Sequence, residues 1–354
     1  MSMTSNYEFA LSHATGDYVC IIGDDDGLMP DALQALNKVL FGTEIEAISW
    51  KRAIYFWSQY YKPELRNTLQ TSLKSSFRKY DSKKTVKELL AFKPGSKVDF
   101  FTDLANLYHG FIRRDTIDRL RLPDGRFFNS PFPDVYAALV VSCAVENLYQ
   151  SDVPYTLPGI SKHSTGFATE NSQSLQKFIL ETDIPLHSHM KIVPYSYALC
   201  TAECFLKIRD SFPEAAQFEL DIKGMTRKTM EDAVDLSADN YQFVVEAVRY
   251  TCEIYGLQEH ADRVIAENPN APVKSPVILG YHFFNDFLVL KLDENVKNVY
   301  DATLIYQKLV EKNLFGFYIL EGNRFLLSSV KNYGIGNSIS KGIRRISEKL
   351  GFTS

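Results

Sequence analysis

Three aspartates stand side by side directly after a short apolar run, and residues of this type and spacing could bind a cation. The run covers residues 18–22 (YVCII), and Gly23 separates it from Asp24, Asp25 and Asp26. Adjacent carboxylates repel one another, so a cation or hydrogen-bond donors must compensate their charge. Mg²⁺ is typically bound by one or two carboxylates together with phosphate groups of a substrate. The alternative is a solvated acidic turn in which one aspartate caps the next helix.

The elements that must position these aspartates are those of an α/β protein. We expect a helix at residues 6–14, and the apolar run after it is typical of a strand covered on both faces. Pro30 suits the first turn of a following helix, and residues 46–50 are expected to form another strand. Ligands of open α/β sheets bind outside the carboxyl ends of the strands, which is where the aspartates would lie.

The rest of the chain divides into two parts. Residues 59–84 are polar and rich in Ser, Thr and Lys, which favours a long surface loop of the kind that often covers an active site. Asp134 opens a strongly apolar segment that is expected to be helical. Helical spacing then dominates, so we expect an α/β domain at 1–175 and a mainly α-helical accessory domain at 176–354.

Composition excludes some classes of protein. The 354 residues carry a net charge of −4, which gives no reason to expect a nucleic-acid partner. No apolar stretch reaches the roughly 18 residues of a transmembrane helix, and the N-terminus lacks the pattern of a signal peptide. Five cysteines in mostly apolar surroundings indicate reduced core thiols and a cytoplasmic location.

The stretch NYEFALSHATGDYVCIIGDDDGLMPDALQAL resembles the middle of a family 2 glycosyltransferase with the GT-A fold. The shared pattern is a helix ending in Ala-x-Gly-x-Tyr, an apolar strand, an acidic D-x-D type cluster, and then a proline and a helix. Gly23 stands where many members carry the first acid of the cluster. The resemblance implies that Asp25 and Asp26 bind the metal and the donor diphosphate, and that Asp24 faces the ribose or sugar of the donor.

The resemblance implies roles for five further residues. Asp134 corresponds to the general base of inverting enzymes, and a carboxylate at a helix N-terminus is oriented by free backbone N–H groups. Lys162 and His163 lie where such enzymes fold a loop over the donor, which makes both diphosphate contacts and His163 a metal ligand. His109 and Arg113 are expected on the acceptor side, as acceptor or phosphate contacts. The alternatives are a simple helix cap at Asp134 and ordinary loop or surface residues elsewhere.

The function implied by the resemblance is metal-dependent, inverting glycosyl transfer. A nucleotide-diphosphate sugar would be the donor, a polysaccharide or glycolipid hydroxyl the acceptor, and Mn²⁺ or Mg²⁺ the cofactor. Only seventeen residues precede the apolar run, whereas the family builds its nucleotide pocket from strands before it. We therefore expect an incomplete GT-A sheet that is truncated or has lost donor binding.

A second hypothesis is a non-catalytic interaction or membrane-surface module derived from such an enzyme. Residues 337–354 form a basic amphipathic pattern, which could contact the inner face of the membrane. The alternative for this segment is a terminal helix that packs on its own domain.

Overall fold

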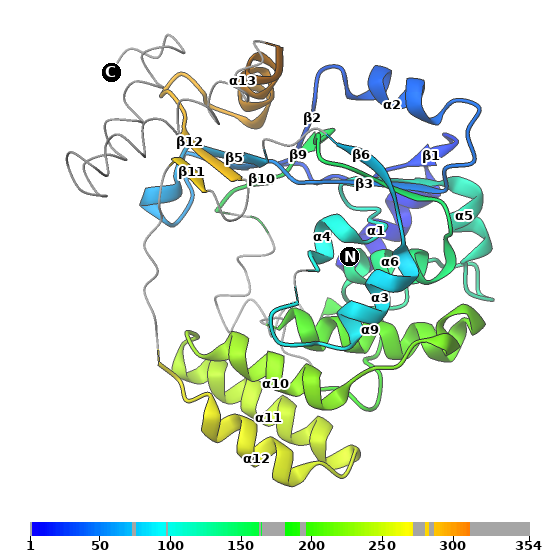
Figure 1. Cartoon of the computed structure of the whole chain (residues 1–354), viewed down its shortest axis with the longest axis vertical. Helices are drawn as coiled ribbons and strands as arrows, with labels where there is room; N and C mark the ends of the chain where they lie inside the picture. Colours follow the sequence, from blue (N-terminus) through cyan, green and yellow to red (C-terminus); the bar gives the residue numbers. More distant parts are fainter. Residues whose placement is uncertain are drawn as a thin grey trace.

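The computed structural model describes residues 2–72, 76–96, 98–162, 164, 181–191, 196–271, 280–282 and 287–311, which form a mixed α/β protein (Figure 1). The helices are α1 (Met3–Ser12), α2 (Ala32–Leu40), α3 (Ser82–Leu90), α4 (Phe100–Asp103), α5 (Arg114–Arg119), α6 (Pro133–Ala144), α9 (Tyr197–Ser211), α10 (Ile222–Ala233), α11 (Ala238–Ile254), α12 (Gln258–Glu267) and α13 (Val299–Glu311), with 3-10 turns η1 (Pro63–Leu65) and η2 (Pro213–Gln217). The strands are β1 (Tyr18–Val19), β2 (Gly27–Leu28), β3 (Ala47–Trp50), β4 (Ile54–Phe56), β5 (Thr68–Ser72), β6 (Phe77–Tyr80), β7 (Gly110–Arg113), β8 (Leu148–Ser151), β9 (Thr156–Leu157), β10 (Gly159–Ile160), β11 (Gly280–His282) and β12 (Phe287–Lys291).

The main sheet has the strand order β1-β7-β3-β8-β6. Strands β1, β3 and β8 run in one direction, because β7 is antiparallel to both β1 and β3 while β3 is parallel to β8. The residues that follow β1, β3 and β8 therefore meet at one edge of the sheet, which we call the carboxyl edge. Strand β7 runs the other way and begins at this same edge.

Burial explains the central elements of this sheet. All four residues of β3 are buried, as expected for a strand that is covered on both faces. Helix α6 is buried around almost its whole circumference, because it lies between the sheet and α9 (Figure 1). Helix α2 covers the opposite face of the sheet (Figure 1). The strand expected at residues 46–50 and the helix expected after Asp134 are thus confirmed.

A second sheet, in the order β10-β4-β5-β12-β11, corrects the expectation of a long loop at residues 59–84. In place of that loop the chain forms β5, β6 and the start of α3. Thr68 and Thr71 of β5 are polar but buried. Their β-branched side chains favour a strand conformation. Strand β5 pairs with β4 on one side and with β12 on the other, where Thr68 lies opposite Lys291. The described residues after 176 thus include two strands, β11 and β12, that were not expected.

The helical part after β10 agrees with the predicted helical spacing. Ser196, Asp221 and Ser237 each accept a hydrogen bond from a backbone N–H of the first turn of α9, α10 and α11. Helix α9 packs on α6, and α10–α12 pack below it (Figure 1). None of the helices within the described ranges has the length and apolar composition needed to cross a membrane. The basic amphipathic segment 337–354 lies outside the described residues.

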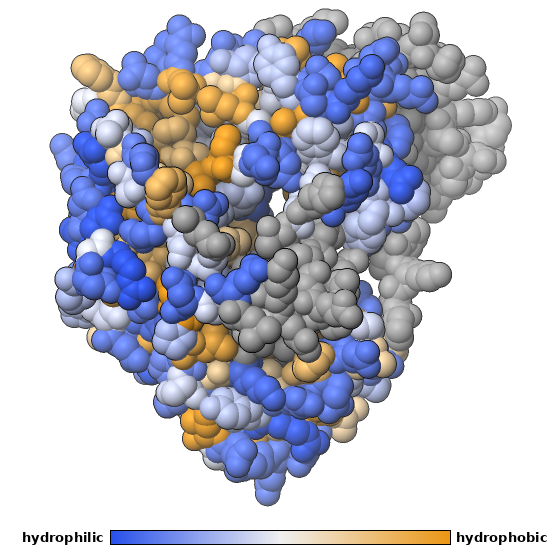
Figure 2. Space-filling view, turned by 180° about the vertical axis from the view of Figure 1, so that it is seen from behind, coloured by the Kyte–Doolittle hydropathy of each residue, from blue (hydrophilic) through white to orange (hydrophobic). Residues whose placement is uncertain are grey.

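Apolar side chains gather on the back of the half that holds the main sheet, while the α10–α12 end is mostly hydrophilic (Figure 2). On α2 and directly after it, Leu33 and Phe41 expose 58% and 83% of their surface. Strand β1 pairs with β7 on one side and is the edge strand of the main sheet as described. All five cysteines are free, and four of them are buried, in keeping with the expected core thiols.

Candidate functional site at the carboxyl edge

Asp26 is the best-anchored of the three aspartates. Its Oδ2 accepts hydrogen bonds from the Gly23 N–H at 2.6 Å and the Tyr108 hydroxyl at 2.8 Å, and lies 3.1 Å from His109 Nε2. Its Oδ1 accepts from the Gly159 N–H at 2.8 Å. These groups come from residues 23–26 themselves, which we call the aspartate turn, from the two residues before β7 and from β10. The carboxylate therefore ties both sheets together at the carboxyl edge.

A chain of hydrogen bonds determines the protonation state of His109, the neighbour of Asp26. Trp50 Nε1 donates to Thr156 Oγ1 at 2.9 Å, which leaves the Thr156 hydroxyl free to donate to His109 Nδ1 at 2.8 Å. His109 is then neutral, with its proton on Nε2 facing Asp26. Burial lowers the pKa of His109, in agreement with a neutral ring. Burial alone would raise the pKa of Asp26, but the contact with His109, followed by the N–H groups of Gly159 and Gly23, outweighs it and lowers that pKa to about 2.

Asp24 and Asp25 are less engaged than Asp26. Asp25 is half-buried, and its Oδ2 accepts a hydrogen bond from Ser164 Oγ at 2.5 Å. Its backbone carbonyl accepts from Trp57 Nε1 at 3.3 Å. Asp24 is exposed at the tip of the turn. Ser164 belongs to the segment that follows β10, so this segment reaches back over the aspartate turn.

Gly159 makes the close approach of β10 to the aspartate turn possible. A Cβ atom at this position would lie 1.8 Å from the Asp25 carbonyl oxygen and 2.7 Å from Trp57 Nε1. Because a backbone carbonyl is one of these neighbours, no side-chain rearrangement could make room. Only glycine allows the Gly159 N–H to reach Asp26 in this arrangement.

Asp134 lies in the first turn of α6, directly after Pro133. Burial raises the pKa of its carboxyl, while the Val135 backbone N–H and the positive charge of Arg52 act against this rise. The residue still keeps partial contact with solvent. A carboxylate with a raised pKa at a helix N-terminus is suited to accept a proton from a bound hydroxyl group.

Arg52 follows β3 and brings a positive charge to the same edge. Its guanidinium carbon lies 3.8 Å from the centre of the Phe101 ring and 5.6 Å from the centre of the Tyr108 ring. Its Nε and Nη2 atoms are buried and have no hydrogen-bond partner among the described residues. The arginine thus stands between the aspartate turn, which Tyr108 contacts, and Asp134, whose charge it influences.

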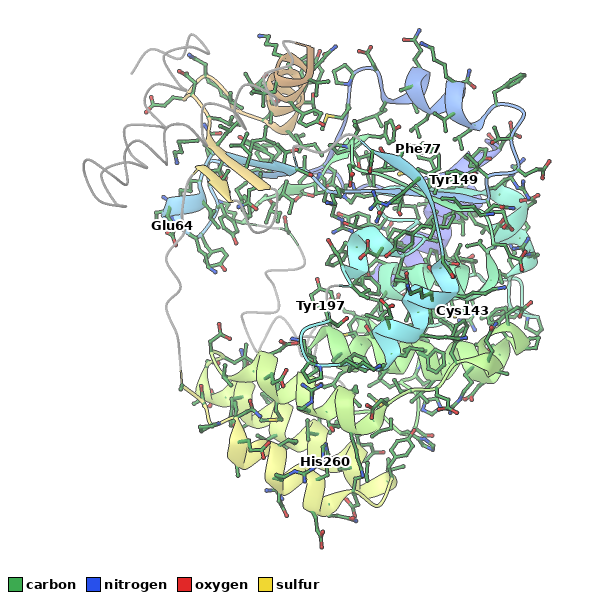
Figure 3. The ribbon with its side chains drawn as sticks, in the orientation of Figure 1. Glu64, Phe77, Cys143, Tyr149, Tyr197 and His260 are labelled. Carbon is green, nitrogen blue, oxygen red and sulfur yellow. The ribbon has the colours of Figure 1, made fainter. Side chains whose placement is uncertain are left out.

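Two tyrosines complete the surroundings of Arg52 and Asp134. Tyr197, at the start of α9, packs its edge against Phe101 with ring centres 5.3 Å apart, on the side of α9 that faces α4 (Figure 3). Tyr7 of α1 lies 6.4 Å from Tyr108 between ring centres. The pKa of Tyr7 is raised, first by burial and then by the negative charge of Asp134, whereas Tyr197 is 56% exposed. Elements far apart in sequence therefore converge on this region.

The structure brings together some of the predicted site residues and separates others. Arg113 needs a correction: antiparallel β7 places it opposite Tyr18, at the other end of the strand from the aspartate turn, where it pairs with Asp115 at 2.7 Å. The expected role of His109 as an acceptor or phosphate contact also needs a correction. Its side chain is wholly buried beside Asp26 and Thr156, out of reach of a substrate.

Of the predicted loop residues, Lys162 is exposed in the turn before Ser164. His163 lies outside the described residues.

Sequence analysis missed Arg52, Tyr108 and Gly159. Arg52 had a usable signal, since a charged residue directly after a buried strand lies at the carboxyl edge as the aspartates do. The sequence carries no such signal for Tyr108 and Gly159, because their roles depend on contacts with Asp26, which is distant from both in sequence.

A divalent cation fits this turn only in part. Asp26 gives most of its hydrogen-bonding capacity to the protein, whereas Asp25 Oδ1 and both oxygens of the exposed Asp24 have no hydrogen-bond partner among the described residues. The described part of the chain contains no group of three or more His, Cys, Asp or Glu side chains that could hold a metal. This donor set suits an ion that takes one or two carboxylates and completes its coordination with substrate phosphates.

No protein-family model matches the chain, and a search of the curated proteins finds no significant match.

Proposed function

We propose that the protein is a metal-dependent glycosyltransferase of the inverting type. It would move a sugar from a nucleotide-diphosphate donor to a hydroxyl of a polysaccharide or glycolipid. The observation that carries the proposal is the shared position of two acidic groups: the aspartate turn after β1 and Asp134 of α6 are linked through Tyr108 and Arg52. A donor and an acceptor bound there would lie side by side.

Asp25 and Asp24 are the residues that would hold Mn²⁺ or Mg²⁺. Asp26 then acts as the anchor of the turn, and Ser164 orients the Asp25 carboxylate. When bound, the cation would neutralise the negative charge of the leaving diphosphate. Lys162 and His163 remain proposed diphosphate contacts, because Ser164 beside them already reaches Asp25.

Asp134 is the proposed general base. As the acceptor oxygen forms a bond with the anomeric carbon and the bond from that carbon to the diphosphate breaks, Asp134 takes the proton of the acceptor hydroxyl. Its raised pKa brings it closer to the working pH, which makes proton transfer more favourable. Backbone N–H groups of the first turn of α6 keep the carboxylate oriented.

The architecture supports an incomplete GT-A domain as the finer description of the α/β part. The aspartate turn follows a strand of a mixed sheet, and that strand is at the edge of the sheet, where the family would continue with its N-terminal strands. A cytoplasmic location is proposed from the five free cysteines. Contact of residues 337–354 with the membrane surface remains a proposal from their sequence pattern.

A calorimetric titration with UDP and Mn²⁺ tests the metal and donor site, because it needs no knowledge of the acceptor. The double variant Asp24→Asn with Asp25→Asn should weaken Mn²⁺-dependent binding by at least about tenfold, which is about 1.4 kcal/mol. Asp17→Asn, which changes an exposed aspartate just before β1, is the matched control and should bind as the wild type does. Equal binding by all three proteins would contradict the proposed metal site. A panel of nucleotide sugars in place of UDP covers the choice of base and sugar.

A non-catalytic interaction module is the second candidate, and Asp26 is the observation that favours it. This carboxylate already accepts three hydrogen bonds from the protein and lies 3.1 Å from His109 Nε2, so its negative charge is compensated without a ligand. Under this alternative, wild-type protein would show no Mn²⁺-dependent binding of any nucleotide or nucleotide sugar in the same titrations.

A further inference from the structure

Arg52 is a half-buried arginine, and two of its three guanidinium nitrogens are buried without a hydrogen-bond partner in the described part of the protein. Its Nε and Nη2 atoms are shielded from solvent and lack a hydrogen-bond partner there. An arginine cannot lose its proton in a protein, so burial leaves the positive charge in place. A buried charge without a partner is strongly unfavourable unless something compensates it.

Other arginines of the chain do not share this situation. Arg119 lies 2.8 Å from Glu46, Arg121 lies 3.2 Å from Glu8, and Arg126 lies 2.6 Å from Asp124. The fold therefore places a carboxylate beside each of these arginines. Two of the carboxylates, those of Glu46 and Glu8, come from distant parts of the chain. No such ion pair forms at Arg52 within the described ranges.

The acids nearest to Arg52 are already engaged or act only at a distance. Asp99 influences the charge of Arg52, but its carboxylate accepts hydrogen bonds from the Phe101 N–H and from Thr102 Oγ1. Asp134 also influences that charge, without forming an ion pair with Arg52. Neither carboxylate fills the vacant donors.

The vacant donors define the shape of the missing group. Nε–H and Nη2–H point in parallel from one edge of the guanidinium plane, which is the arrangement that grips two oxygens of a carboxylate or phosphate. Phe101 lies over the guanidinium at 3.8 Å from its carbon to the ring centre, so a ligand cannot bind on that side. A planar or tetrahedral oxyanion fits this geometry better than a single hydroxyl group.

We propose that Arg52 binds a carboxylate or phosphate group carried by the acceptor substrate, next to Asp134. The identification of the bound group as part of the acceptor rests on the proposed function, whereas the oxyanion site itself depends on Arg52 alone. The acceptor would then be an acidic saccharide or a sugar phosphate, and the fork of Arg52 would hold it while Asp134 takes the proton of its hydroxyl.

Titration calorimetry with simple anions tests the site without metal or donor. Wild-type protein should bind glucuronate and inorganic phosphate, but not glucose, in buffers whose ionic strength is matched with sodium chloride. Arg52→Met should weaken the binding of both anions by at least about tenfold, and Arg52→Lys should restore it only in part, because lysine lacks the fork. Arg249→Met is the control, since Arg249 is an exposed arginine on α11 that pairs with Asp262 at 3.1 Å.

The stability of the variants shows whether they fold. Arg52→Met removes a charge that is buried and unpaired, so its midpoint of urea unfolding should not fall below that of the wild type. The anions should also raise the midpoint of the wild type, but not that of Arg52→Met. Equal binding of anions by wild type and a folded Arg52→Met, or no binding by either, would overturn the proposal.

Two further measurements distinguish a failure of this proposal from a failure of the proposed function. The Asp24→Asn and Asp25→Asn double variant should bind glucuronate and phosphate as the wild type does, even if it loses UDP with Mn²⁺. An Arg52-dependent response to UDP, with none to glucuronate or phosphate, would assign Arg52 to the donor and overturn the acceptor site.

Discussion

Tyr108 joins the aspartate turn to the buried arginine. Its hydroxyl donates to Asp26 Oδ2 at 2.8 Å, while its ring centre lies 5.6 Å from the Arg52 guanidinium carbon. The same residue thus contacts the negative charge after β1 and the positive charge after β3. It holds the two halves of the candidate site at a fixed separation.

Tyr108→Phe should destabilise the protein, because it leaves a buried, charged acceptor with one donor fewer. We expect a loss of about 1–3 kcal/mol in the free energy of unfolding, measured by urea denaturation. Tyr300→Phe is the control, since Tyr300 is 62% exposed on α13 and should change stability by less than about 0.5 kcal/mol. Equal effects of the two substitutions would mean that the Tyr108 hydroxyl contributes nothing to the turn.

Stability should fall in acid because of Asp26. Its folded-state pKa of about 2 lies below the ordinary value of 3.8, so its contribution is complete above pH 3.8 and is lost as the pH falls toward 2. The contribution is about 2 kcal/mol at neutral pH. Urea unfolding at a series of pH values checks this: Asp26→Asn should be less stable than wild type at pH 7, and the difference should shrink between pH 4 and pH 2. A difference that stays constant across this range would exclude the carboxylate as its source.

Gly159→Ala should displace the aspartate turn. The added methyl group would lie 1.8 Å from the Asp25 carbonyl oxygen, so β10 must move away and the Gly159 N–H loses Asp26. Such overpacking costs about 1–3 kcal/mol in stability, and Mn²⁺-dependent binding of UDP should weaken with it. Gly16→Ala is the matched control, because its nearest contact would be 3.3 Å from a carbonyl oxygen and requires only a small adjustment. If both variants behave alike, the close approach at Gly159 is not needed.

Asp134→Asn should remove the general base while leaving the fold intact. Transfer to an acceptor should slow by about 10²–10⁴-fold, with little change in donor binding. Asp134 must be ionised to accept a proton, and its pKa is raised, so wild-type activity should fall with decreasing pH at a midpoint above the ordinary 3.8. Asp124→Asn, at an exposed aspartate, should keep both the rate and the pH profile. A wild-type rate for Asp134→Asn would rule out this base.

Local sequence patterns predicted much of the α/β part, but they could not predict which strands pair across the sheets. The apolar run at β3 and the helix after Asp134 are determined by neighbouring residues, so their spacing was enough. The strand expected at residues 18–22 is reduced to the two residues of β1 at the sheet edge, and Ile22 is 39% exposed. The buried, polar β5 was mistaken for a loop, because one of the two strands that enclose it is β12, more than 200 residues later in the chain. No sequence period reveals such a partner.

The candidate site divides in the same way. Residue type and position predict Asp25 and Asp134 as site residues; Asp25 follows β1, and Asp134 lies in the first turn of α6. Type and position could not distinguish Asp26, whose oxygens are taken by donors from Tyr108 and β10. Arg113 was placed wrongly because sequence alone does not give the direction of β7.

The pairing of β12 with β5 sets an order for folding during synthesis. The main sheet uses residues up to Ser151 and can assemble while the rest of the chain is still being translated. The second sheet has to wait until Lys291 has left the ribosome, and until then β5 exposes an unpaired edge. A nascent chain stalled between these two points would hold a complete main sheet beside a second sheet that still lacks β12 and β11.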